Sequence, residues 1–280
     1  MNSGVTLNLK IPSDISLAAH QMYNPQNTYL RIGDCLESIA DQIHLSLIDS
    51  TSILDQSTIF RLALASSFQY AELLPDSLAS NASLKRVDWK YALYLPINHP
   101  GIHKNALCNF RQGLHSSSEA INEFGQLLQI LSEFGLFTNL KDHFLDPDEV
   151  ISITCLINRI NILQSAMKAG LSLISSLEPD WLAGQVPPNW FNRYKSGPII
   201  SVDYFNPADL QTYVDQIGTD IHSVISVIEK SDLPVLSSRP EIQALVRLFQ
   251  NQYISDGEKL CWKNHGCVDC VRNILKYEGE

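Results

Sequence analysis

Apolar residues recur at helical spacing along most of this chain. Stripes at i, i+3 and i+4 predict a helix wherever they persist, because these positions share one face of a helix. The helices predicted in this way cover residues 31–48, 59–74, 78–84, 104–114, 118–134, 148–177, 207–230 and 240–253. Residues 1–28 are mostly polar and are predicted to be an extended lead. The expected fold class is mainly α: a multi-helix domain, then a long helix and a helical C-terminal region.

Small polar residues and glycine predict where several of these helices begin and end. Ser57 is a candidate N-cap for the helix 59–74, and the serines at 116–118 precede the helix 118–134. Gly135 follows that helix and is typical of a C-terminal cap.

The segment 86–113 combines aromatic and charged residues more densely than the rest of the chain. A short apolar run at 87–95 is followed by Pro100-Gly101, which favours a turn, and then by the helix 104–114. Spacing alone favours a packed helical hairpin with its charged residues facing water.

The aromatic residues of this segment divide into two groups. Trp89 and Phe110 are predicted to be buried anchors on either side of the turn. Tyr91 and Tyr94 lie beside Lys90, so they are expected to be more exposed, as base-stacking aromatics are in nucleic-acid binders.

Composition indicates a soluble globular protein. The chain has 280 residues, 45% apolar and 18% charged, which is compatible with one or two domains. Apolar runs are far shorter than the roughly 20 residues of a membrane span, and no secretory signal precedes the first helix. We therefore expect no membrane partner, a cytoplasmic location and reduced cysteines.

Charge is distributed unevenly. Residues 61–115 carry six basic and three acidic residues, although the whole chain has a net charge of −10. Since DNA phosphates require clustered cations, only this segment is a candidate nucleic-acid face. The candidate DNA-binding residues are Lys85, Arg86, Lys90, Lys104 and Arg111.

Several blocks of residues, in order, are similar to a known family. The central blocks are Asp88-Trp89-Lys90-Tyr91-Ala92-Leu93, Pro100-Gly101 and Phe110-Arg111. Further blocks are Arg61 to Leu64, Phe68-Gln69, Gly135-Leu136, Ile157-Asn158-Arg159, residues 178–182, residues 187–194 and Asn251-Gln252-Tyr253. Together they resemble the InsH-like N-terminal region of bacterial insertion-sequence transposases, over about residues 30–255.

This resemblance implies a domain organisation and a class of activity. It implies a polar lead at 1–28, a helical N-terminal transposase domain at 29–137, the start of a catalytic region with a helical insertion at 138–255, and a tail at 256–280. The family carries out DNA transposition, a form of DNA recombination, with a ribonuclease H-like catalytic domain. Three carboxylates of that domain hold two metal ions that act on a phosphodiester.

Asp146 matches the first of these carboxylates. The residues that surround it in the family are not matched here, and the other two carboxylates have no counterpart. Pro147 and the acids after it favour another role for Asp146, as the cap of the helix that follows. We therefore expect no catalysis by this chain alone, and a requirement for Mg²⁺ only if a partner chain supplies a catalytic half.

The tail contains four potential zinc ligands within ten residues: Cys261, His265, Cys267 and Cys270. Cys267 and Cys270 have the spacing of one half of a structural zinc site. The alternative is that they are reduced thiols and a surface histidine.

Three functions remain open at this stage. The first is a truncated or domesticated transposase fragment that binds DNA at terminal inverted repeats, or binds a partner, without catalysis. The second is a subunit of an active transposase whose catalytic half is a separate chain. The third is a helical interaction scaffold without DNA binding, and in each case homo-oligomers are possible partners.

Overall fold

A computed structural model describes residues 10–39, 55–115, 117–140, 145–195, 204–231, 234–256 and 259–263. The described residues are mainly helical, so the predicted fold class is confirmed. The chain divides into two compact units, Met1–Cys155 and Leu156–Glu280. This division lies inside one long helix, α8 (Pro147–Leu177), whereas the four predicted domain ranges stay predictions.

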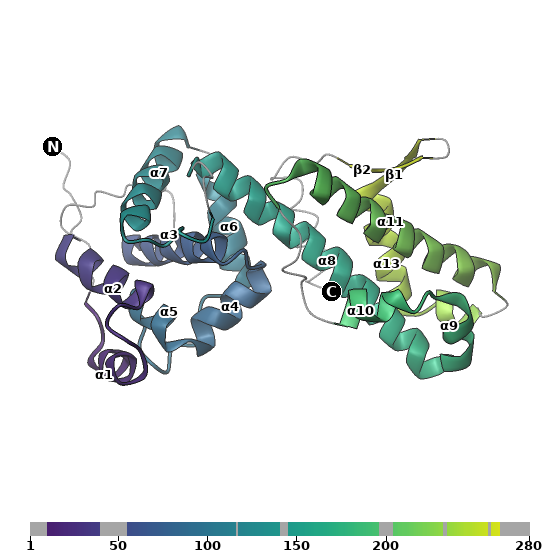
Figure 1. The fold of residues 1–280 in the computed structure, drawn as a ribbon, viewed down its shortest axis with the longest axis horizontal. Coiled ribbons are helices and arrows are strands. Elements are labelled where there is room, and N and C mark those ends of the chain that lie inside the picture. Colours follow the sequence, from purple (N-terminus) through teal and green to yellow (C-terminus); the bar gives the residue numbers. More distant parts are fainter. Residues whose placement is uncertain are drawn as a thin grey trace. The chain divides into compact units, whose positions relative to one another are not determined.

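The first unit is built from seven helices within the described ranges and the start of α8 (Figure 1). They are α1 (Ser13–Met22), α2 (Thr28–Ile39), α3 (Gln56–Ala71), α4 (Asp76–Lys85), α5 (Val87–Ala92), α6 (Lys104–Leu114) and α7 (Ser118–Glu133). Helix α1 corrects the prediction of an extended lead, because Ile15 and Ala19 lie one turn apart and are both buried.

Helix α3 is the centre of the first unit. Every residue from Ile59 to Ala71 except Arg61 is buried, because α4, α6 and α7 all pack against it. Asp55 caps its start by accepting a hydrogen bond from the Thr58 N–H at 2.9 Å, so the choice of Ser57 as the cap was wrong. Hydrogen bonds from Ser57 and then Thr58 lower the pKa of Asp55.

The predicted boundaries of α7 and α8 are confirmed. Ser117 caps α7, with its hydroxyl 3.2 Å from the N–H of Ala120, and Gly135 follows the helix with a φ of +80°. Asp146 precedes α8, and Pro147 is its first residue. Among the described residues, α8 is the one helix long and apolar enough to cross a membrane, but 61% of its most apolar stretch is buried, which is typical of a core helix in a soluble protein.

The second unit contains the rest of α8, five further helices and a hairpin within the described ranges. These elements are α9 (Pro179–Gln185), α10 (Asn189–Lys195), α11 (Pro207–Lys230), α12 (Pro234–Ser237), α13 (Pro240–Gln252), β1 (Tyr253–Asp256) and β2 (Lys259–Trp262). The long helices α11 and α13 match the predicted ranges. The short helices α9 and α10 were not predicted, and Trp190 on α10 is buried.

The hairpin was not predicted either. Its strands pair antiparallel, from Tyr253 opposite Trp262 to Asp256 opposite Lys259. Gly218 on α11 makes room for it, since a Cβ there would lie 2.4 Å from the Tyr253 ring. The Tyr253 hydroxyl also donates a 2.7 Å hydrogen bond to the carbonyl of Val214, which fixes the hairpin on α11.

Candidate nucleic-acid interface

The Pro100-Gly101 turn lies against the C-terminal end of α4. The N–H of Ile102 donates a 2.8 Å hydrogen bond to the Ser83 hydroxyl. Gly101 has a φ of +82°, and a Cβ at this position would lie 2.9 Å from the backbone of Leu84. The turn therefore requires glycine, both for its left-handed backbone and for the close approach.

Lys85 and Lys104 flank this turn. Lys85 is exposed in the last turn of α4, and Lys104 is the half-buried first residue of α6. Because Ser83 and Ile102 are hydrogen-bonded, the two lysines come from neighbouring segments. These two residues agree best with the predicted basic face.

Lys90, another predicted DNA contact, lies in the interior with 3% of its surface exposed. Its ammonium group donates hydrogen bonds to the backbone carbonyls of Ile97 at 2.7 Å and His99 at 2.6 Å. Burial lowers the pKa of Lys90, and the nearby Asp14 carboxylate opposes that shift. The expectation that Lys90 faces DNA is therefore corrected: its charge holds the loop that leads into the turn.

Arg111 is also buried, with 2% of its surface exposed. Its Nη2 lies 2.8 and 2.6 Å from the two carboxylate oxygens of Asp76, and its Nη1 donates to Gln69 at 3.1 Å. Gln69 in turn donates to Asp76 at 2.6 Å. This closed network joins α6 to α3 and α4, so the expectation that Arg111 contacts DNA is corrected in the same way.

Arg86 is half-buried and fully engaged within the chain. Its guanidinium group bonds both oxygens of Asp88, at 3.1 and 2.7 Å, and both oxygens of Glu72, at 2.8 and 2.7 Å. It also lies over the rings of Tyr29 and Trp89, 5.2 and 5.4 Å from their centroids. A phosphate would have to compete with two carboxylates for this cation.

Glu72 connects the aromatic residues around Arg86. It accepts hydrogen bonds from the Tyr29 hydroxyl and, at 3.1 Å, from the Trp89 indole N–H. Burial and the Glu72 charge raise the pKa of Tyr29. Phe68 completes the cluster, with its ring 5.5 Å from that of Trp89.

The predicted anchors are confirmed, and the predicted stacking residues are wrong. Trp89 is completely buried, and Phe110 packs edge-on against Phe124 with ring centroids 6.0 Å apart. Tyr91 and Tyr94 are equally buried, since their hydroxyls bond Asp34 and the Gly33 carbonyl on α2. The short helix α5 packs against α1, α2 and α4, and its residues from Asp88 to Ala92 are buried.

Asp146 occupies the position of a helix cap. Its side chain is exposed and accepts a 2.9 Å hydrogen bond from the N–H of Asp148. Within the described ranges, no group of three or more His, Cys, Asp or Glu residues is placed to hold a metal ion. The capping role is confirmed, whereas the family-matched catalytic role stays a prediction.

The zinc hypothesis lies mostly outside the described residues. Cys261 is a free, half-buried thiol on β2, and His265, Cys267 and Cys270 fall beyond residue 263. Cys155 on α8 is disulfide-bonded, so the expectation that all cysteines are reduced is wrong for this one.

The second unit holds a polar cluster that the sequence did not predict. Arg159 on α8 donates to Gln252 at 3.0 and 2.8 Å and to the Lys263 carbonyl at 2.8 Å. Its guanidinium group also lies 3.9 Å from the centroid of the Trp262 ring. Arg159 thus joins α8 to the end of α13 and to the hairpin.

Blocks that resemble the family contact one another in both units. Phe68-Gln69 meets the blocks that contain Trp89 and Arg111, and Ile157-Asn158-Arg159 meets Asn251-Gln252-Tyr253. Comparisons with protein-family models, curated proteins and solved structures find no match to this chain. The family resemblance therefore stays a prediction.

Proposed function

We propose that this chain is a transposase-related protein that binds DNA at terminal inverted repeats and does not cleave DNA by itself. The observation that carries the proposal is the pairing of the family-like blocks in the interior, such as Arg111 with Gln69 and Arg159 with Gln252. Residues that are scattered in sequence but pair in space are what a shared scaffold requires. In this proposal the family-like blocks resemble the family mainly because they stabilise a shared fold. Direct contact with DNA is a smaller part of the resemblance.

The proposed DNA contact is the surface around the Pro100-Gly101 turn, with Lys85 and Lys104 at its centre. Arg86, Lys90 and Arg111 support this surface from inside through their ion pairs and carbonyl contacts. Two cations give weak binding with a shallow salt dependence. A second copy or a catalytic partner chain would add the phosphate contacts that this chain lacks.

Measured DNA binding tests the proposal. The probe is a duplex with the inverted repeats that flank the chain's own gene, compared with a scrambled duplex by fluorescence anisotropy over a range of salt concentrations. The double variant Lys85→Glu with Lys104→Glu should weaken binding and reduce the slope of log K against log salt by about 2. Lys230→Glu, an exposed charge reversal on α11, is the matched control and should leave binding unchanged.

A cleavage assay tests the second half of the proposal. The chain should neither cut nor join DNA with Mg²⁺ or Mn²⁺, because Asp146 is engaged as a cap and the family's other carboxylates are unmatched. Strand cleavage that disappears in Asp146→Ala would contradict this. Cleavage that appears only after a separate catalytic chain is added would favour the subunit hypothesis, in which that partner brings the Mg²⁺ site.

A scaffold without DNA binding is the second candidate. The observation in its favour is that Lys90 and Arg111 are buried inside the protein, while the chain as a whole carries a net charge of −10. The absence of measurable binding to either the repeat or the scrambled duplex would select this function.

A cytoplasmic location is part of the proposal, since DNA transposition takes place inside the cell. The disulfide at Cys155 is the observation against it, because cytosolic thiols are normally reduced. Alkylating all thiols in denaturant at the moment of cell lysis, followed by mass spectrometry, should find Cys155 modified if it is reduced, as expected of a cytoplasmic chain.

A further inference from the structure

Arg61 is a half-buried cation on α3 without a carboxylate partner. Its Nη1 lies 3.4 Å from the Ser57 hydroxyl, and this is the one hydrogen bond that its side chain makes among the described residues. The Nε of the same guanidinium group is buried and has no hydrogen-bond partner there. Burial lowers the pKa of Arg61. A guanidinium group shielded from water normally bonds a carboxylate or a phosphate, because its planar fork of donors matches both.

Two other arginines of the first unit have the partner that Arg61 lacks. Arg86 and Arg111 each bond at least one carboxylate. The acid whose charge acts on Arg61 is Asp55, which opposes the lowering of the Arg61 pKa. Asp55 is exposed, caps α3 and accepts its hydrogen bonds from Ser57 and Thr58, and within the described ranges it forms no ion pair with Arg61. The fork of Arg61 is therefore open to another anion.

His99 supplies a second donor close to this cation. The Arg61 charge contributes to the lowered pKa of His99, so the two groups lie within electrostatic range of each other. The Nδ1 of His99 accepts a 3.1 Å hydrogen bond from the Gly101 N–H, which leaves the proton of the neutral ring on Nε2. In the part of the chain that the structure describes, this Nε2–H donates to no other group.

The surroundings of these two donors are basic and adjoin the Pro100-Gly101 turn. The charge of Lys90 also acts on His99. Helix α6 packs against α3 and begins shortly after the turn, at Lys104. Lys85 flanks the turn on its other side. An anion bound by Arg61 would therefore lie in a region of positive potential.

We propose that Arg61 and His99 form a binding site for one phosphate group beside the Pro100-Gly101 turn. The guanidinium fork of Arg61 bonds two phosphate oxygens, and the Nε2–H of His99 donates to a third. The phosphate belongs either to a DNA backbone that contacts Lys85 and Lys104 or to a free phosphate or phosphorylated small molecule. The DNA source rests on the proposed function, whereas the site itself does not require DNA binding.

Inorganic phosphate added to the full chain is the first probe. The imidazole nitrogen signals of His99, followed by NMR at constant ionic strength with chloride as the reference anion, should shift and saturate as phosphate is added. Arg61→Gln should raise the phosphate dissociation constant by at least about tenfold, because a charge-assisted bidentate contact is lost. His115, an exposed histidine after α6, is the internal reference and should not shift.

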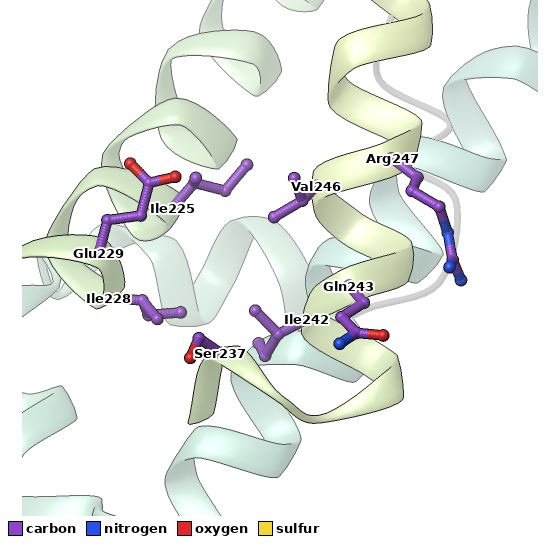
Figure 2. Close-up of a pocket in the computed structure, with 8 residues that line it drawn as sticks. All are labelled: Ile225, Ile228, Glu229, Ser237, Ile242, Gln243, Val246 and Arg247. Carbon is purple, nitrogen blue, oxygen red and sulfur yellow. The ribbon is translucent and has the colours of Figure 1, made fainter. Parts of the chain in front are cut away.

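An arginine of the second unit provides the matched control. Arg247 on α13 stands at the rim of an open cavity of about 350 Å³ (Figure 2), and its side chain is exposed. Arg247→Gln removes the same charge as Arg61→Gln but should leave the phosphate dissociation constant unchanged. Arg61→Lys keeps the charge without the planar fork, so it should bind phosphate more weakly than the wild type and more tightly than Arg61→Gln.

The repeat duplex distinguishes the two sources of the phosphate. If DNA supplies it, Arg61→Gln should weaken binding to this duplex and reduce the slope of log K against log salt by about 1. If Arg61→Gln abolishes phosphate binding and leaves DNA binding unchanged, the site takes a free phosphate group. A chain that binds phosphate through Arg61 but binds no DNA would contradict the proposed function and support the site.

Two results would overturn the site itself. The first is a wild-type chain whose His99 signals do not respond to phosphate, a measurement that needs no variant. The second is a phosphate dissociation constant that is the same in the wild type and in Arg61→Gln. Circular dichroism of each variant ensures that a change in phosphate binding is not caused by a change in folding.

Discussion

In the first unit, the buried cations Lys90 and Arg111 are enclosed by carbonyl and carboxylate oxygens. In the second unit, by contrast, the charged side chains of Glu229 and Arg247 are exposed and make no ion pair or hydrogen bond among the described residues. Partners for the first pair come from loops and from helices far apart in sequence. The second pair has partners only if another molecule brings them. Charged residues thus stabilise the interior of the first unit, whereas these two stand unpaired on the surface of the second.

This contrast changes how a family-like motif is interpreted. The motif 88–93 is rich in aromatic and charged residues, a composition that is also common at nucleic-acid surfaces. In the structure these side chains are buried and bonded. The side chains of this motif therefore stabilise the fold of the first unit.

Emptying the aromatic centre of the first unit should have the largest effect. Trp89→Ala should lower the free energy of unfolding by about 3–5 kcal/mol, because it leaves a large cavity and removes a hydrogen bond to Glu72. Tyr94 was predicted to be more exposed, but it is buried. Tyr94→Ala should therefore also lower the free energy of unfolding, by several kcal/mol. Denaturant titration measures both, with Trp181→Ala, a half-buried tryptophan of the second unit, as the control. A loss under about 1 kcal/mol for Trp89→Ala would contradict the folding role.

Breaking the Arg111 network should follow in size. Arg111→Ala should lower the free energy of unfolding by about 3 kcal/mol, because the Asp76 carboxylate would lose its cationic partner and the Gln69 amide oxygen would lose this donor. Lys85→Ala, which removes an exposed cation, should change stability by less than about 0.5 kcal/mol. If Arg111→Ala kept the wild-type free energy of unfolding and lost only DNA affinity, Arg111 would be a surface contact for DNA. Its assignment to the interior would then be wrong.

The second unit also contains a buried ion pair, between Arg193 and Asp220. Asp220 is buried on α11 and bonds Arg193 and, at 2.8 Å, the Tyr194 hydroxyl. Asp220→Asn should lower the free energy of unfolding by about 1.5–3 kcal/mol, since it weakens charge-assisted hydrogen bonds. Hydrogen exchange should accelerate in α10 and α11 and remain unchanged in α3. Faster exchange in α3 would show that the units do not have separate interiors.

The smallest effect should be a pH dependence centred on His99. Burial, then the neighbouring charges of Lys90 and Arg61, lower the pKa of His99 below its ordinary value. Its Nδ1 accepts a 3.1 Å hydrogen bond from the Gly101 N–H, which requires an unprotonated nitrogen. A lowered pKa in the folded state means that this stabilisation is present above the unfolded-state pKa of about 6.5 and is lost as the pH falls through the folded value.

Replacement of the titrating group tests this interpretation. His99→Asn retains an acceptor for the Gly101 N–H but cannot be protonated, so the difference in stability between the two proteins should shrink as the pH falls. A difference that stays constant from neutral to acidic pH would exclude His99 as the titrating group. His115, an exposed histidine after α6, is the control position.

Sequence periodicity predicted the long helices well, because α7, α8, α11 and α13 each bury one face. It also predicted a helical hairpin around the Pro100-Gly101 turn, and α5 and α6 confirm its two helices. It was wrong in placing the charged residues of α5 in water, because Asp88 and Lys90 are buried. It failed for Lys90 and Arg111, because the groups that bond these two cations lie between 7 and 42 residues away in the chain. The hairpin was missed since its position depends on Gly218 and Arg159, which belong to distant helices.

The enclosure of Lys90 by two carbonyl groups has a consequence for its chemical reactivity. An amine attacks an acylating reagent only as a free base with an open lone pair, and the Lys90 ammonium is buried and donates to Ile97 and His99. Lys85 is exposed in the same unit and has no such shield. Lys90 should therefore resist amine-directed labelling and enzymatic acylation in the native protein and react only after unfolding, so the modification state of one side chain reports whether the first unit is intact.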